Sequence, residues 1–245
     1  MSTQPRRVAL VTGGARRLGR AFTEALAEDG LAVAVHYGRA AEEADEVVAG
    51  IRQAGGEAEA FGADLRDADA AKTLPGRVVA RFGRLDVLVN SAAEMERRTV
   101  EETTVEEWDA TMALNLRAPF LVAQQAAPHL KATQGRIVNI ADLSGFEPWR
   151  HYVAHSVSKA GVVMLTKVLA VALAPEITVN GIAPGTVLVP DDYDDARRTF
   201  LSETTPLGRL GTPGDAVAAL RYLVHHAPFV TGETIVVDGG RLLRR

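Results

Sequence analysis

Hydrophobic residues along this chain follow two alternating patterns. Short runs of four or five apolar, mostly β-branched residues are typical of strands buried on both faces of a sheet. Longer segments with apolar positions every three or four residues are typical of helices. The short runs predict seven strands, at residues 8–11, 31–35, 57–61, 86–89, 136–140, 177–180 and 234–237. The longer segments predict helices at residues 18–28, 41–54, 69–82, 105–130, 152–173 and 213–225.

The alternation of strands and helices indicates repeated βαβ units, and therefore an α/β fold with a seven-stranded, mostly parallel sheet and helices on both faces. No linker, repeat or low-complexity segment interrupts the pattern, so we expect residues 1–245 to form a single domain. The least regular stretch, residues 186–206, follows a strand at the edge where open α/β sheets bind ligands. It is either a solvated surface loop with a short helix or a mobile substrate lid.

Composition narrows the function classes. The formal net charge of −4 argues against broad binding to nucleic acid or anionic membranes. The absence of cysteine excludes disulfides, cysteine nucleophiles and thiolate metal sites. No apolar run approaches the ~20 residues of a membrane span, and the first residues lack a signal-peptide pattern. We therefore expect a cytoplasmic protein acting on a small molecule, without a metal site, since the six histidines lack ligand spacing.

A glycine-rich turn follows the first predicted strand and reads Thr12-Gly13-Gly14-Ala15-Arg16-Arg17-Leu18-Gly19. Glycines also make ordinary tight turns, but at this position their N–H groups and the following helix can hold a pyrophosphate. The second strand ends in His36-Tyr37-Gly38-Arg39, without the carboxylate that holds the ribose of NAD. Because Arg39, Arg16 or His36 can pair with a 2′-phosphate, we predict NADPH as cofactor in preference to NADH.

Residues 152–161 resemble the Tyr-x-x-x-Lys active-site helix of the short-chain dehydrogenase/reductase family, with His155 at the tyrosine position and Lys159 as the lysine. The glycine-rich turn is similar to that family's Thr-Gly-x-x-x-Gly-x-Gly loop, with Arg17 at the middle glycine. Arg17, residues 36–39 and Asp142, which stands where the family has serine, resemble the pteridine-reductase branch in particular. The resemblance covers residues 8–240 and implies a doubly wound Rossmann-type fold with NADP(H)-dependent oxidoreductase activity.

The resemblance also implies roles for particular residues. The implied catalytic groups are Asn115, which would hold a proton-relay water, together with Asp142, His155 and Lys159. The implied substrate contacts are Arg17, Met95, Asp142 and Trp149. The predicted cofactor contacts are Gly13, Arg16, Arg17, Leu18, Gly19, His36, Tyr37, Arg39, Asp64, Leu65, Asn90, Ser91, Ala92, Lys159, Pro184, Gly185 and Thr186.

The histidine leaves the chemistry open. Residues 155 and 159 share a helix face, so Lys159 disfavours a charged imidazole whereas Asp142 favours one. His155 therefore either transfers protons or merely fills the space of a tyrosine, and Tyr152 is a less favourable substitute, about 10 Å from Lys159 along the helix.

Two functions from different classes follow. The first is an NADPH-dependent reductase of a small planar heterocycle or a carbonyl compound, and the second is an NADP(H)-binding protein with little catalysis. A 3-oxoacyl-carrier-protein reductase is disfavoured by Asp142 and by the acidic segment 191–195, which would repel an acidic carrier protein. Family members commonly form tetramers through helices matching residues 105–130 and 160–173, so we expect a homotetramer.

Overall fold

A computed structural model describes residues 6–189 and 193–243. Its seven strands form one sheet in the order β3-β2-β1-β4-β5-β6-β7, and every neighbouring pair is parallel. The predicted α/β class and parallel sheet are thus confirmed. The strands are β1 (Val8–Thr12), β2 (Ala32–Tyr37), β3 (Ala58–Gly62), β4 (Val87–Asn90), β5 (Arg136–Ile140), β6 (Thr178–Pro184) and β7 (Thr234–Val237).

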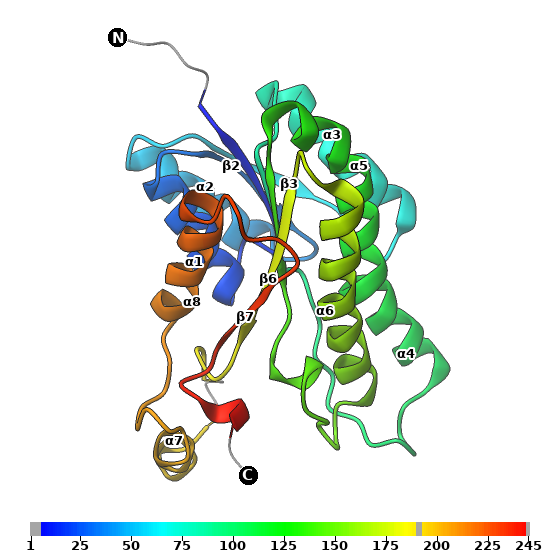
Figure 1. The fold of residues 1–245 in the computed structure, drawn as a ribbon, viewed down its shortest axis with the longest axis vertical. Helices are drawn as coiled ribbons and strands as arrows, with labels where there is room; N and C mark the ends of the chain where they lie inside the picture. Colours follow the sequence, from blue (N-terminus) through cyan, green and yellow to red (C-terminus); the bar gives the residue numbers. More distant parts are fainter. Residues whose placement is uncertain (1–5, 190–192, 244–245) are drawn as a thin grey trace.

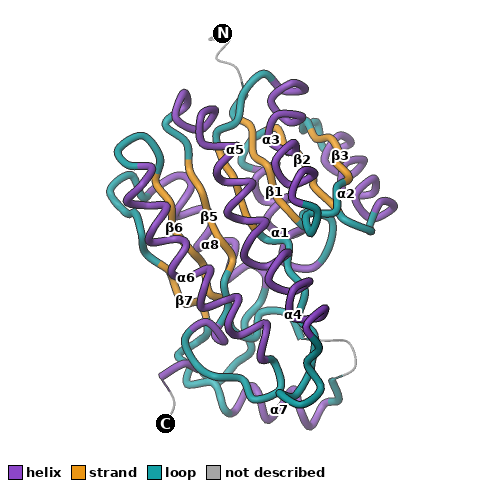
Figure 2. Tube along the Cα trace, turned by 90° about the vertical axis from the view of Figure 1, so that its right-hand side faces the viewer, coloured by secondary structure: helices purple, strands orange, loops and turns teal. Residues whose placement is uncertain are grey.

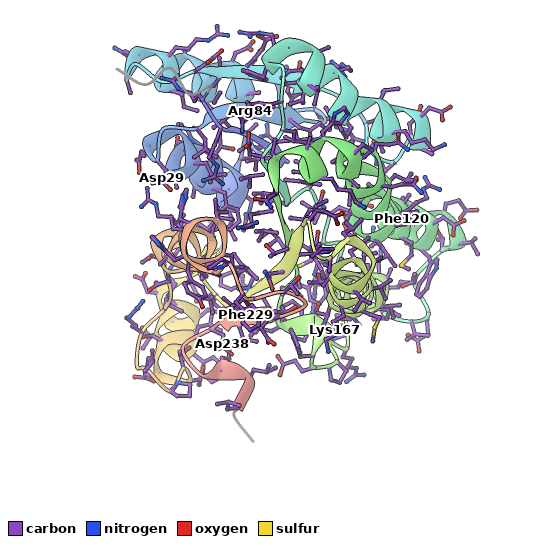
Figure 3. The ribbon with its side chains drawn as sticks, turned by 45° about the horizontal axis from the view of Figure 1, so that its top comes forward. Asp29, Arg84, Phe120, Lys167, Phe229 and Asp238 are labelled. Atoms are coloured by element: carbon purple, nitrogen blue, oxygen red, sulfur yellow. The ribbon has the colours of Figure 1, made fainter. Side chains whose placement is uncertain are left out.

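Helices cover both faces of this sheet, as Figure 1 shows. One layer contains α1 (Arg17–Glu28), α2 (Ala41–Gln53) and α8 (Pro213–Arg221). The other layer contains α3 (Ala68–Phe82), α5 (Ala118–Thr133) and α6 (Val153–Leu173). Asp29, next to α1, and Phe120, on α5, lie on opposite sides of the molecule in Figure 3.

Two hydrophobic clusters fill the space between the sheet and its helix layers. Phe22 and Leu220 belong to the cluster beneath α1 and α8, and Leu74 and Leu121 to the cluster beneath α3 and α5. The inner strands β1, β2, β4, β5 and β6 are buried on both faces, which explains their nearly continuous apolar sequences, whereas the edge strands β3 and β7 are only partly buried. The chain order reverses between β1 and β4, and open α/β sheets bind ligands at such a switch point.

The helix predicted over residues 105–130 forms as one continuous helical segment, but it contains a π-helical turn that was not predicted. The chain forms α4 (Val105–Met112), then a π-helical turn over Ala113–Arg117, and then α5. A second π-helical turn, Tyr222–His226, follows α8. Such turns carry one extra residue per turn and are frequent at functional sites, and periodicity does not reveal them because the apolar pattern continues through the bulge.

The irregular stretch after β6 contains a short helix, α7 (Asp195–Glu203), which begins where Asp194 accepts a 2.8 Å hydrogen bond from the Arg197 N–H. In Figures 1 and 2, α7 lies below the ends of the strands. The predicted acidic segment 191–195 is only partly placed, since Asp191 and Asp192 lie outside the described residues.

The helix α6 is long and apolar enough to cross a membrane by length and composition alone. The core helix of an α/β enzyme satisfies the same criterion. The helix α6, which carries His155 and Lys159, packs against β6. It is therefore one of the helices that cover the sheet.

Candidate active site

A cleft of about 730 Å³ opens at the carboxyl ends of the strands. It brings together most residues that were predicted for the cofactor and the chemistry. Those that line it are Gly13, Arg16, Arg17, Leu18, Gly19, His36, Tyr37, Arg39, Asp64, Leu65, Ser91, Ala92, Met95, Asp142, His155, Lys159, Pro184 and Gly185. Four predicted residues are not among the lining: Asn90, Asn115, Trp149 and Thr186.

The glycine-rich turn packs so tightly that only backbone fits. A Cβ atom on Gly19 would lie 2.1 Å from the Gly13 carbonyl oxygen, and Gly13 itself has a φ of +65°. Thr12 Oγ1 accepts hydrogen bonds from the N–H groups of Ser91 and Ala92, at 3.0 and 3.1 Å, which ties the turn to the end of β4. The close-packed turn and the start of α1, both of which line the cleft, therefore suit a pyrophosphate, and the residues present fit a dinucleotide.

Arg17 keeps the backbone conformation of the glycine that the resemblance places there. Its φ is +51°, in the left-handed region, which costs an ordinary residue roughly 1–2 kcal/mol. Within the described part of the chain, its guanidinium makes no hydrogen bond or ion pair. The side chain is therefore available to a ligand in the cleft that it lines.

His36 supports the turn and does not act as a phosphate partner, which corrects that part of the prediction. Its Nδ1 accepts the Gly13 N–H at 3.1 Å, and its Nε2 lies 3.0 Å from the Ala63 carbonyl oxygen. One donor and one acceptor define a neutral imidazole with its proton on Nε2. Burial lowers the pKa of His36 to about 4, against the opposing hydrogen bond to Ala63, so the ring carries no charge for a phosphate near neutral pH.

The arginines predicted for the 2′-phosphate differ in their surroundings. Arg16 forms an ion pair with Glu43, on the first turn of α2. Arg39 lines the cleft and has no ion-pair partner in residues 6–189 and 193–243. Asp64 is held by Arg66, which donates to both carboxylate oxygens at 3.0 and 2.9 Å, so Arg66 is a cleft residue that the sequence reasoning missed.

The chemical end of the cleft is formed by Asp142, which follows β5, and by two residues of α6. His155 Nε2 lies 2.6 Å from Asp142 Oδ2, and His155 Nδ1 lies 3.1 Å from the carbonyl oxygen of Glu94. Lys159 Nζ donates to the Ile140 carbonyl oxygen at 2.8 Å. The three predicted groups thus meet at one place.

Charge and burial act together on these groups. Burial raises the pKa of Asp142, but the hydrogen bond with His155 and the charge of Lys159 outweigh it, and the net shift is downward. Burial lowers the pKa of Lys159, and the carboxylate of Asp142 opposes that change. Asp142 is therefore ionised more readily than an ordinary carboxyl group, although it is mostly buried.

Asn115, in the π-helical turn, acts through Glu94. Its Oδ1 accepts the Glu94 N–H and its Nδ2 donates to the Glu94 carbonyl oxygen, both at 2.9 Å. The amide nitrogen also donates its other hydrogen to Ser158 Oγ, at 3.1 Å. The amide thus fixes the carbonyl that contacts His155. No sequence motif pointed to Glu94, because its role rests on a backbone atom.

Three more predicted contacts lie away from the cleft. The side chain of Trp149 faces His155, with ring centroids 6.3 Å apart, and its indole N–H donates to Glu147 at 3.0 Å. Asn90 is buried and donates to Asn139 Oδ1 at 2.9 Å. Thr186 lines a neighbouring cavity of about 440 Å³ below β7.

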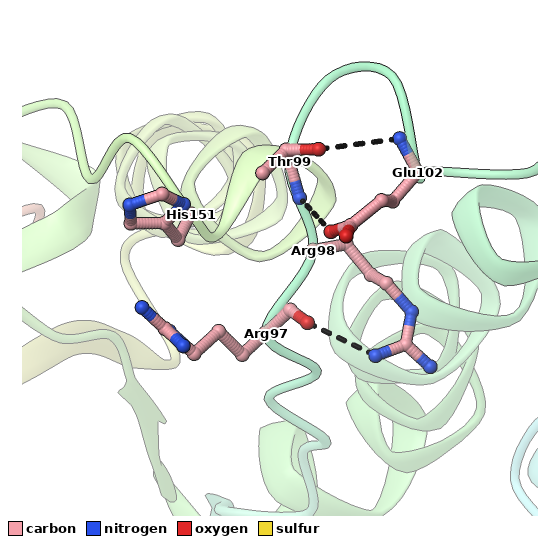
Figure 4. Close-up of a pocket in the computed structure, with 5 residues that line it drawn as sticks. All are labelled: Arg97, Arg98, Thr99, Glu102 and His151. Atoms are coloured by element: carbon pink, nitrogen blue, oxygen red, sulfur yellow. Dashed lines mark hydrogen bonds between the residues drawn. The ribbon is translucent and has the colours of Figure 1, made fainter.

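A further pocket, of about 450 Å³, lies where the loop after β4 meets the loop before α6 (Figure 4). Arg98 donates its N–H to the His151 carbonyl oxygen at 2.8 Å and so joins the two loops. Glu102 accepts the Thr99 N–H at 3.0 Å, which places a carboxylate among the basic side chains. The residues that line this pocket are all different from those that line the cleft. No group of three or more metal-ligating side chains occurs within residues 6–189 and 193–243.

Fold and cleft together define an α/β dinucleotide-binding oxidoreductase. Residues 7–196 match the family model described as short chain dehydrogenase, and the chain belongs to this family. Family members typically bind NAD(H) or NADP(H).

Curated relatives span the whole chain. A 3-oxoacyl-[acyl-carrier-protein] reductase of Synechocystis sp. is 36% identical over 99% of this chain and 100% of its own. A 3beta-hydroxysteroid dehydrogenase of Eggerthella lenta is 34% identical over 96% of this chain and 93% of its own. Neither is a pteridine reductase, so that branch rests on the motifs alone.

Solved structures give the same fold. A dehydrogenase/reductase from Sinorhizobium meliloti has a TM-score of 0.89 at 41% identity, covering 96% of this chain and 94% of its own. An acetoin dehydrogenase from Enterobacter cloacae has a TM-score of 0.90 at 29% identity, covering 100% of this chain and 98% of its own. The chain is thus a short-chain oxidoreductase over its full described length.

Proposed function

We propose that this protein is an NADPH-dependent reductase of a small carbonyl compound, in which His155 takes the place of the family's tyrosine. The observation that carries the proposal is the 2.6 Å contact between Asp142 and His155 within the cleft. A residue that only filled space would not need a charged partner at hydrogen-bond distance. A bound nicotinamide cofactor would supply the hydride.

The hydrogen-bond partners of His155 imply that His155 and Asp142 share a proton that can be transferred. His155 Nδ1 lies 3.1 Å from the Glu94 carbonyl oxygen, which only accepts hydrogen bonds, and 3.5 Å from the amide nitrogen of Asn115. Because the contact with Glu94 is the shorter one and the Asn115 amide already donates to Glu94 and Ser158, we assign a hydrogen to Nδ1. The contact between Nε2 and Asp142 therefore contains either an imidazolium beside a carboxylate or an imidazole beside a carboxylic acid. In both arrangements one proton lies between the two groups. The lowered pKa of Asp142 favours the ion pair.

Exposure indicates how this proton reaches a substrate. The side chain of His155 is 3% exposed and both of its nitrogens are occupied, whereas the side chain of Asp142 is 19% exposed. When a carbonyl carbon gains hydride, its oxygen needs one proton to become a hydroxyl. We infer that Asp142 passes this proton on and that His155 replaces it. Lys159, which keeps two donors beyond its bond to Ile140, supplies positive charge to the site.

The proposed substrate class rests on the relatives. The two curated relatives above are named for 3-oxo and 3-hydroxy compounds, which favours a carbonyl substrate over the planar heterocycle that the pteridine-like motifs suggested. A 3-oxoacyl thioester is the second candidate, because the match to the Synechocystis reductase spans both chains almost completely.

The preference for NADPH is part of the proposal. Arg39 lines the cleft without an ion pair among the described residues, although its charge helps to lower the pKa of Asp64, and the end of β2 carries no carboxylate to repel a 2′-phosphate. Gly13, Gly19 and the start of α1 would hold the pyrophosphate. The cytoplasmic location and the homotetramer remain predictions, the latter supported by exposed apolar side chains of α6, namely Met164, Val168 and Val171.

The test is NADPH oxidation by the native protein and by His155→Tyr, measured side by side with ketone, 3-oxoacyl thioester, quinone and dihydropterin substrates from pH 5 to 8. We expect the native protein to reduce a carbonyl substrate. Turnover only after His155→Tyr would instead identify an NADP(H)-binding protein that has lost its proton donor. Turnover restricted to the dihydropterin would restore the heterocycle hypothesis.

A further inference from the structure

The ion pair between Arg16 and Glu43 joins the glycine-rich turn to the first turn of α2. Arg16 was expected to face a 2′-phosphate, and it does line the cleft. Its guanidinium is instead engaged by a carboxylate that lies 27 residues further along the chain. The neighbouring Glu42 is exposed and forms no ion pair in the described structure.

The carboxylate of Glu43 has the partners that an anionic ligand would take. It accepts a hydrogen bond from Arg16, and both the nearby backbone N–H of Glu43, in the first turn of α2, and this bond lower the pKa of the carboxyl group. N–H groups at a helix start and a guanidinium are also the usual partners of a phosphate. Glu43 is therefore ionised at neutral pH and occupies an anion's place beside Arg16.

We propose that Glu43 is a specificity-determining residue that competes with the 2′-phosphate of NADP(H) for Arg16. An incoming phosphate must either displace Glu43 from Arg16 or bind Arg39 alone. Glu43 also repels a second negative charge, but has no such effect on a free ribose hydroxyl. It therefore narrows the difference in affinity between NADP(H) and NAD(H), and this inference rests on the proposed use of NADPH.

The measurement is the Kd of 2′,5′-ADP and of 5′-AMP by calorimetry, for the native protein, Glu43→Gln and Glu42→Gln. These nucleotides differ in the 2′-phosphate, and the two variants remove the same charge from adjacent residues. Because an exposed ion pair contributes little, we expect Glu43→Gln to bind 2′,5′-ADP about threefold to fivefold more tightly. Its affinity for 5′-AMP should stay within about twofold, and Glu42→Gln should change both Kd values less.

A double-mutant cycle separates competition from a general charge effect. With Arg16→Gln in the background, Glu43→Gln should no longer improve 2′,5′-ADP binding beyond what Glu42→Gln does. Equal effects of the two glutamine variants, or weaker 2′,5′-ADP binding by Glu43→Gln, would overturn the proposal. The second result would mean that Glu43 orients Arg16 for the phosphate.

The failure of the proposed NADPH preference gives a different result. In one outcome, the native protein binds 2′,5′-ADP no better than 5′-AMP, whereas Glu43→Gln binds 2′,5′-ADP more tightly than 5′-AMP. This outcome refutes the NADPH preference and supports the role of Glu43. If neither discriminates, both proposals are wrong. If the native protein discriminates and Glu43→Gln matches Glu42→Gln, only the role of Glu43 is wrong.

Discussion

Two buried histidines at the same edge of the sheet have opposite hydrogen-bond environments. His36 is 2% exposed and lies between a donor, the Gly13 N–H, and an acceptor, the Ala63 carbonyl. His155 is 3% exposed and has an acceptor close to each ring nitrogen, the Glu94 carbonyl and the Asp142 carboxylate, with the Asn115 amide nitrogen farther away at 3.5 Å from Nδ1. The first environment fixes a neutral ring. The second places a titratable carboxylate against Nε2.

The difference shows that burial alone does not decide what a histidine does. Around His36 the partners are backbone atoms that cannot change protonation, so the ring serves as a fixed link between the glycine-rich turn and the end of β3. Around His155 one partner is itself titratable, so the pair can give up and regain a proton. The histidine at the cofactor end of the cleft thus has only backbone partners, whereas the histidine at the chemical end has a titratable partner, as the proposed proton transfer requires.

The largest effect is expected from removing the titratable partner. Asp142→Asn should lower kcat by about 10²–10³, within the range for general acid–base catalysis, because the amide cannot pass on a proton. The Kd for NADPH should change less than about twofold. Single-turnover kinetics and a binding titration check both numbers.

Ser144→Ala is the control, because it removes the Ser144 hydroxyl that donates to Asp142 Oδ1 at 2.5 Å but keeps the pair with His155. We expect less than a tenfold loss of kcat. Comparable losses in the two variants would mean that Asp142 matters for local structure and not for proton transfer.

The next effect concerns His36 and is a change in stability with pH. The pKa of His36 falls from 6.5 in the unfolded chain to about 4 in the folded one, mainly through burial. Between these values the unfolded chain binds more protons, so the free energy of unfolding decreases as pH falls from 6.5 to 4, by roughly 3 kcal/mol. His36→Asn should lose this part of the pH dependence.

Urea unfolding at pH 7.5, 5.5 and 4.5 measures how the free energy of unfolding depends on pH in the native protein and in His36→Asn. His226→Asn is the control, since His226 is exposed and should leave the dependence unchanged. If His36→Asn and the native protein lose stability in parallel on acidification, His36 is not neutral in the folded state.

The smallest effect comes from Arg17, whose φ is +51°. Arg17→Gly should raise the free energy of unfolding by about 0.5 kcal/mol, because the gain from removing left-handed strain slightly exceeds the entropy of a new glycine. Gln134 has the same φ at the end of α5, away from the cleft, so Gln134→Gly should stabilise the protein similarly.

Ligand binding separates the two substitutions. Arg17→Gly should weaken binding of the cofactor or the substrate, and Gln134→Gly should not. Thermal unfolding and an NADPH titration of both variants test this. Unchanged binding by Arg17→Gly would show that the arginine at the glycine position has no ligand role.

Several features of the site were readable from the sequence because they are local. The glycine-rich turn follows β1 directly, and His155 and Lys159 are one helical turn apart. The parallel direction of the strands follows from the βαβ alternation, whereas the strand order came from the structure. The π-helical turn around Asn115 was missed, because a bulge of one residue hardly disturbs the apolar pattern.

The sequence by itself determined the α/β fold and the place of the cleft at the strand ends, and it singled out Asp142, His155 and Lys159 as candidate catalytic residues. Only the tertiary structure decided which polar atoms the side chains of the cleft contact. It brought the Glu94 carbonyl to His155 across 61 residues, set Glu43 against Arg16, and committed both nitrogens of His36 to backbone. The physical reason is that apolar periodicity reports which face of an element is buried, whereas the charge and tautomer of a buried group depend on single polar atoms that distant segments supply.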